Sequence, residues 1–174
     1  WKQAIALLQE LLEVKNLELD VVPFAAAINA CTNGQEWLPA LLILSEVNSV
    51  QVEVNVITYN SAISACEKSG EWQKAFDLLH AMPKQQLQED VISYNSSISA
   101  CEKVSKWSLA LQLFDDLRQR ELEASLISYN STISACAKSG EWQRALALLE
   151  DADATATGCD VISYNAAITA CSNA

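Results

Sequence analysis

Residues 91–101 read VISYNSSISAC, and the same pattern returns three more times along the chain. It reads VITYNSAISAC at 56–66, LISYNSTISAC at 126–136 and VISYNAAITAC at 161–171. A weaker copy, VVPFAAAINAC, occupies 21–31, so that five cysteines stand 35 residues apart. A fixed period of this length is typical of proteins in which similar units stack side by side. The period therefore indicates the fold class before any single helix is assigned.

Each repeat is predicted to hold two helices. In the repeat 56–90, Tyr59, Ile63 and Cys66 follow the spacing of one helix face. Gly70 is expected to end this first helix. The N-cap of each first helix is predicted at the third residue of its repeat, which is Thr58, Ser93, Ser128 or Ser163. The second helices are expected to bury a stripe of recurring tryptophans in the core: Trp37, Trp72, Trp107 and Trp142.

The repeats are expected to form one array over residues 1–174. We place full repeats at 21–55, 56–90, 91–125 and 126–160, with half repeats at 1–20 and 161–174. Residues 1–20 are one residue longer than their counterparts, and the extra residue is placed in a loop near Asn16. Since one hairpin cannot bury its apolar face, the hairpins must stack. The predicted fold class is all-α, a right-handed solenoid of stacked antiparallel helix pairs, and the sequence looks like a fragment of a longer array.

The composition is that of an ordered chain with an acidic surface. Hydrophobic residues make up 51% of the 174 residues, and the net charge is −11. This charge argues against a generic nucleic-acid binder, because phosphates attract basic surfaces. It also argues against non-specific binding to membranes, and no apolar run is long enough for a membrane span.

Catalytic and metal chemistry find little support in the sequence. The five periodic cysteines are expected to be reduced thiols in the core, and no Cys/His cluster suggests a metal. His80 is the single histidine and has no counterpart in other repeats. We therefore expect no enzymatic activity in this piece, no cofactor and no metal.

The motif resembles the pentatricopeptide repeat family in both period and pattern, over essentially the whole chain. The variant SACEKSGEWQ at 64–73 is similar to repeats common in algal and dinoflagellate members. The resemblance implies an array that binds single-stranded RNA, with about one base per repeat. It also implies a role in organellar RNA processing or stabilisation, in a chloroplast or mitochondrion.

The resemblance further implies roles for four positions of each repeat. The fifth and last residues would read the base: Asn60, Asp90, Asn95, Ser125, Asn130, Asp160 and Asn165. The second residues would pack against the base: Val22, Ile57, Ile92, Ile127 and Ile162. The thirteenth residues would lie near phosphates: Lys68, Lys103 and Lys138.

The same resemblance implies a base preference. Asn paired with Asp is expected to favour uracil, and Asn paired with Ser to favour cytosine. The three repeats that begin at Val56, Val91 and Leu126 would then read a U-C-U-like, pyrimidine-rich RNA. Ala25 with Asn55 departs from the pattern, because alanine offers no side-chain hydrogen bond.

Structural alternatives stay open for these residues. The asparagines suit the solvated first turn of a helix, Asp90 and Asp160 suit a helix N-terminus, and the lysines suit any surface. A second hypothesis is a protein-binding scaffold of tetratricopeptide-like use, which the acidic balance favours because an anionic groove suits a basic partner. The location of the charges separates the two hypotheses. Lysines in a line along the concave groove, with most carboxylates on the second helices and loops, favour RNA, and acids lining the groove favour a basic protein partner.

Overall fold

The computed structural model describes residues 1–14, 20–50 and 52–172. The predicted extra residue near Asn16 lies outside these ranges. The described part of the chain holds ten α-helices and one short 3-10 turn, η1 (Pro83–Gln85). The α-helices are α1 (Lys2–Glu13), α2 (Val21–Asn33), α3 (Trp37–Ser49), α4 (Val56–Ser69), α5 (Trp72–Ala81), α6 (Val91–Lys103), α7 (Trp107–Gln119), α8 (Leu126–Lys138), α9 (Trp142–Ala154) and α10 (Val161–Ser172).

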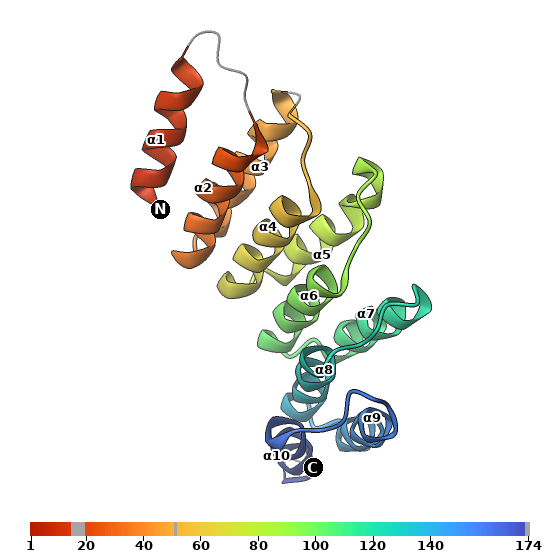
Figure 1. Cartoon of the computed structure of the whole chain (residues 1–174). Coiled ribbons are helices and arrows are strands. Elements are labelled where there is room, and N and C mark those ends of the chain that lie inside the picture. The colour runs from red at the N-terminus through yellow and green to blue at the C-terminus, as the bar shows by residue number, and fades with distance from the viewer. Residues whose placement is uncertain (15–19, 51, 173–174) are drawn as a thin grey trace. The chain divides into compact units, whose positions relative to one another are not determined.

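The helices form two compact units, residues 1–89 and residues 90–174. In the first unit, α2 packs against α3 and α4, and α4 packs against α5. In the second unit, α6 pairs with α7 and α8 with α9, while α6, α8 and α10 lie side by side (Figure 1). We call α2, α4, α6, α8 and α10 the first helices, and α1, α3, α5, α7 and α9 the second helices. The prediction of an all-α fold of stacked helix pairs is confirmed.

The periodic cysteines lie on the first helices, and four of them are buried in the core. Cys31, Cys66, Cys101 and Cys136 have no exposed surface, and all six cysteines of the chain are free thiols. Burial raises the pKa of Cys66 to about 12 and that of Cys101 and Cys136 to about 11. These side chains are therefore protonated, unreactive core residues, as predicted. Cys171 differs and is exposed on α10, where only α8 and α9 cover the helix.

The tryptophan stripe lies at the rim of the core, contrary to the prediction. Trp142 is 39% exposed, and Trp37, Trp72 and Trp107 are half-buried. Each indole stands at the first residue of a second helix, three residues before a fully buried alanine such as Ala110. The alanine brings the two helices of a hairpin close together, which leaves the bulkier ring outside the contact. The guanidinium of Arg144 lies 4.6 Å from the ring centre of Trp107, as suits a ring at the surface.

The N-caps of the first helices also differ from the prediction. The cap is the last residue of the preceding repeat, and the third residue of the helix bonds back to it. Asp90 Oδ1 accepts from the backbone N–H of Ser93 at 2.8 Å, and Ser93 Oγ accepts from the backbone N–H of Asp90 at 2.9 Å. This reciprocal arrangement is a capping box. The helices thus begin three residues earlier than predicted, so that one residue both closes a repeat and starts the next helix.

In the turn between the two helices of a hairpin, the fifteenth residue of the repeat has left-handed backbone conformation. Gly70 and Gly140 have φ of 76° and 74°, while Ser105 takes the equivalent place with φ of 56°. A non-glycine residue in this region is strained by roughly 1–2 kcal/mol. We therefore expect Ser105→Gly to stabilise the protein by about 0.5–1 kcal/mol, after the larger chain entropy of glycine is subtracted.

This effect is measurable as a higher urea midpoint with an unchanged slope. Ser108→Gly is the matched control, because it makes the same change at an exposed position inside α7. The control should lower stability by about 0.5 kcal/mol. Equal losses in the two variants would contradict the assignment of strain to Ser105.

Candidate functional site

The second residue of every first helix is a large aliphatic side chain turned toward solvent. The exposed fractions are 63% for Val22, 69% for Ile57, 61% for Ile92, 61% for Ile127 and 62% for Ile162. Burying such a side chain is worth about 1.5–3 kcal/mol, so its regular exposure leaves binding energy unused. On α6, α8 and α10, which lie side by side, the three isoleucines stand at the same register. Exposed apolar surface that recurs in register is a feature of interaction sites, so these side chains belong to the candidate site.

Beside this apolar row, Asn95 is hydrogen-bonded to the start of the next helix. Its Nδ2 donates to Ser125 Oγ at 3.0 Å, and its Oδ1 accepts from Ser128 Oγ at 2.6 Å. Ser125 is the N-cap of α8, and its Oγ accepts from the backbone N–H of Ser128 at 3.3 Å. The fifth and last residues of the repeat 91–125 are therefore in direct contact.

The repeat 126–160 repeats this arrangement with a carboxylate. Asn130 Nδ2 donates to Asp160 Oδ1 at 3.2 Å, and Ser163 Oγ donates to Asn130 Oδ1. The backbone N–H of Ser163 also donates to Asp160 Oδ1, at 2.8 Å, and this hydrogen bond holds the pKa of Asp160 below its usual value. Asp160 is thus an ionised acceptor at neutral pH. We call Asn95 with Ser125, and Asn130 with Asp160, the fifth–last pairs.

The other predicted base-reading residues lie in different surroundings. Asn60 is buried, with 8% of its surface exposed, and belongs to the first unit, whereas Asp90 caps α6 in the second unit. Asn165 is exposed on α10. In the repeat 21–55, the side chain of Asn55 accepts from the N–H and hydroxyl of Thr58, at 2.9 and 2.8 Å. Of the predicted base-reading pairs, the structure therefore brings into contact Asn95 with Ser125 and Asn130 with Asp160, both in the second unit.

The predicted phosphate-contacting lysines stand in the last turns of first helices. Lys68, Lys103 and Lys138 are all exposed, on α4, α6 and α8. Lys138 Nζ donates to Glu102 Oε1 at 2.7 Å, and Ser134 Oγ donates to the same oxygen at 2.9 Å. The sequence analysis missed this role of Glu102. Its signal is the glutamate at the twelfth position of one repeat, which faces the lysine at the thirteenth position of the next.

The acidic residues avoid the first helices. These five helices carry two acids, Glu67 and Glu102, against the three lysines. Most of the 22 acidic residues stand on second helices and in connecting segments. The net charge of −11 therefore does not describe the helices that carry the fifth–last pairs.

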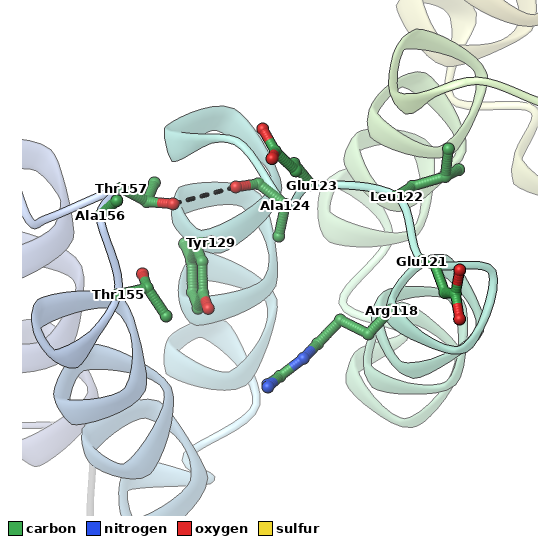
Figure 2. Close-up of a pocket in the computed structure, with 9 residues that line it drawn as sticks. All are labelled: Arg118, Glu121, Leu122, Glu123, Ala124, Tyr129, Thr155, Ala156 and Thr157. Carbon is green, nitrogen blue, oxygen red and sulfur yellow. Dashed lines mark hydrogen bonds between the residues drawn. The ribbon is translucent and has the colours of Figure 1, made fainter.

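A cleft of about 490 Å³ lies between the last two full repeats, at the end where the repeats connect. Figure 2 shows Arg118 directed from α7 toward the side of the cleft where Tyr129 of α8 and Thr155, just after α9, lie. Arg118 and the hydroxyl of Tyr129 both bond Asp151 Oδ2, at 2.7 and 2.8 Å. Because this carboxylate already balances the guanidinium, the cleft is a structural junction between repeats.

Neither a metal site nor a membrane span is found among the residues that the structure describes. They contain no group of three or more His, Cys, Asp or Glu side chains placed to hold a metal ion. None of the helices over 1–14, 20–50 and 52–172 has the length and apolar character needed to cross a bilayer.

Three family models match the chain. The PPR repeat family model matches residues 54–103 and 89–138, the pentatricopeptide repeat domain model matches 6–69, and the PPR repeat model matches 127–152. The chain is a pentatricopeptide repeat protein. No curated protein matches this pentatricopeptide repeat chain. The resemblance inferred from the repeated motif is confirmed.

Solved pentatricopeptide repeat structures share its fold. The maize protein PPR10 in complex with an 18-nucleotide psaJ RNA element is 23% identical, with a TM-score of 0.80 over 96% of this chain. The PPR domain of Arabidopsis thaliana protein-only RNase P 1 in complex with tRNA is 13% identical, with a TM-score of 0.73; the match covers 84% of this chain and 77% of that one. Nuclear proteinaceous RNase P 2 of A. thaliana is 10% identical, with a TM-score of 0.82, covering 97% of this chain and 38% of that one. The chain spans 24% of the length of PPR10.

Proposed function

We propose that this pentatricopeptide repeat chain binds single-stranded RNA and selects bases at about one base per repeat. The observation that carries the proposal is the pair of fifth–last contacts in the second unit, set beside exposed Ile127 and Ile162. An aliphatic side chain gives a dry surface for the face of a base, and the neighbouring amide addresses its polar edge. Side chains of both kinds stand in the first turns of α6 and α8, Ile92 with Asn95 and Ile127 with Asn130, which supports the proposal.

The last residues of the two fifth–last pairs favour different pyrimidines. Asp160 only accepts hydrogen bonds, so it suits the N3–H of uracil. Ser125 carries a hydroxyl that also donates, so it suits the N3 acceptor of cytosine. The pair Asn60 with Asp90 would repeat the uracil preference, which gives the U-C-U-like order.

The relatives support an RNA partner. PPR10 and the RNase P 1 domain were both solved with RNA bound. By family analogy, we place this chain in organellar RNA processing or stabilisation, in a chloroplast or mitochondrion. It would act by covering and positioning a strand, with no bond chemistry of its own.

The test is a titration of the chain, extended by its neighbouring repeats, with U/C-rich and A/G-rich single strands at two salt concentrations. We expect tighter binding of the U/C-rich strand, and weaker binding of both strands as salt rises. Equal and negligible binding of both strands would reject the proposal.

Glu102 should weaken the phosphate contact of Lys138, since it holds the ammonium group at 2.7 Å. The next repeat has Ala137 at the position of Glu102, so Glu102→Ala copies a residue that the fold already accepts. We expect this variant to bind RNA more tightly at low salt, and the slope of log K against log salt to steepen by about 0.7, the value for one more phosphate contact.

The control for this prediction is Glu150→Ala, which removes the same charge from an exposed position on α9. It should leave the salt slope unchanged. A similar steepening in both variants would show that net charge, and not the contact of Glu102 with Lys138, governs binding.

A protein-binding scaffold is the second hypothesis. It required acidic side chains along the first helices, and those helices carry more lysines than acids. Apart from the carboxylates Asp20, Asp90 and Asp160 just before the first helices, a basic protein partner would meet acids mainly on the second helices and in the other connecting segments.

A further inference from the structure

In α8 and α10 the third residue of the helix is a fully buried serine, yet its hydroxyl reaches the base-reading asparagine of the preceding repeat. Ser128 and Ser163 have no exposed surface. Ser128 Oγ lies 2.6 Å from Asn95 Oδ1, and Ser163 Oγ makes the same contact to Asn130 Oδ1. A ligand cannot touch these hydroxyls directly, so any effect they have on recognition passes through the amides.

The Ser128 hydroxyl has two acceptors within reach, Asn95 Oδ1 at 2.6 Å and Ser125 Oγ at 3.1 Å, and the shorter contact favours donation to Asn95. Ser128 Oγ accepts from the backbone N–H of Ser125 at 3.0 Å. A carboxamide oxygen has no hydrogen to donate, so the short contact to Asn95 Oδ1 must use the hydroxyl proton of Ser128. The oxygen of Asn95 is thereby held inward, and its Nδ2 is turned to Ser125 at 3.0 Å. The amide is left with one N–H that it can offer to a base.

The chain contains a natural comparison at Thr58. The preceding repeat has Ala25 at its fifth position, so no amide is present there. The hydroxyl of Thr58 instead donates to the side chain of the cap, Asn55, at 2.8 Å. At Ser163 the hydroxyl also lies 2.9 Å from its cap, Asp160, while it contacts Asn130. Thr58, Ser128 and Ser163 thus all bond their helix cap, and the hydroxyls of Ser128 and Ser163 also contact the asparagine of the preceding repeat.

We propose that Ser128 and Ser163, each the third residue of a first helix, are positioning residues that set the amide orientation of the base-reading asparagine in the preceding repeat. This inference rests on the proposed function. It adds the third residue of the repeat to the positions that determine selectivity. It makes recognition at one repeat depend on the following repeat. A repeat with a correct fifth–last pair will therefore discriminate poorly when the next repeat lacks a hydroxyl at its third position.

The test compares Ser128→Ala with Ser128→Thr, which keeps the hydroxyl, and with Thr58→Ala, which weakens an equivalent cap but faces no amide. Binding is measured to short single strands that differ only in the base opposite the repeat 91–125, U-C-U against U-U-U. Ser128→Ala should lower the cytosine-to-uracil preference about fivefold, as expected for one lost hydrogen bond. Ser128→Thr should restore the preference, and Thr58→Ala should leave it unchanged.

A second readout does not need RNA. The side-chain amide protons of Asn95 should be protected from exchange with water in the unmodified protein. They should exchange about fivefold faster in Ser128→Ala and remain protected in Thr58→Ala. Unchanged Asn95 protection in Ser128→Ala, or an equal loss of preference in Thr58→Ala, would overturn the inference. Absence of RNA binding in the unmodified protein would reject the proposed function, and the amide exchange would still decide the role of Ser128.

Discussion

Phe114→Ala is expected to destabilise the second unit by about 3–5 kcal/mol, the usual cost of removing a buried aromatic ring. Phe114 is 1% exposed, and its ring lies edge-on to that of Tyr129, with 4.9 Å between the ring centres. Phe114 belongs to the repeat 91–125 and Tyr129 to the next one, so the substitution removes contacts within a hairpin and between hairpins. In a stacked array, stability is the sum of these two kinds of contact.

The effect is measured by urea unfolding together with hydrogen exchange read out on peptides. Backbone amides of α6 to α9 should lose protection at lower urea, while those of α2 to α4 keep most of theirs. Phe76→Ala is the control, since Phe76 is half-buried on α5 and packs against His80 at a ring distance of 4.1 Å. It should cost about 1 kcal/mol. A loss of similar size in both variants would contradict the view that Phe114 holds neighbouring repeats together.

The period alone was enough to predict the helices and their stacking. The first helices begin at residues 21, 56, 91, 126 and 161, each at the first letter of a copy of the motif. This succeeds because a hairpin can hide its apolar face only against a copy of itself. The cysteines followed the same logic, since a small apolar side chain fits the narrow space between first helices.

Other features depend on backbone and neighbours that a period does not reveal. Asn55 and Thr58 are both good cap residues, and only the extended backbone of Asn55, with φ of −121° and ψ of 170°, decides between them. Asn60 and Asn95 occupy the same position of the repeat, yet Asn60 is buried and Asn95 is half-buried. The bond between Glu102 and Lys138 joins residues on adjacent helices, so it needs the lateral register of α6 and α8.

The error over the caps has a functional consequence. Because the last residue of a repeat is the N-cap of the next first helix, the proposed base reading and the stability of that helix depend on one side chain. Only residues that cap well are suited to this position, and Asn, Asp and Ser, the types found at 55, 90, 125 and 160, all do. Exchange among these types should change selectivity with little change in stability.

Ser125→Asp tests that expectation and should move the preference at the repeat 91–125 from cytosine toward uracil. The change replaces a hydroxyl that can donate with a carboxylate that only accepts, which reproduces the pair of Asn130 with Asp160. A mismatched polar contact costs about 1–3 kcal/mol, so the ratio of affinities for U-U-U and U-C-U strands should rise by roughly tenfold. Stability should stay within about 0.5 kcal/mol, because Asp and Ser are equivalent N-caps.

Ser125→Ala separates selectivity from capping in the same assay. It removes the cap of α8 and should lower stability by about 1 kcal/mol. It should also reduce the discrimination between cytosine and uracil without creating a preference for uracil. If Ser125→Asp leaves the base preference unchanged while the protein stays folded, the fifth–last pair does not contact the base and the proposed register of the RNA is wrong. The new carboxylate adds negative charge, which weakens the binding of every RNA strand. The readout is therefore the ratio of the affinities for U-U-U and U-C-U strands, measured at one salt concentration.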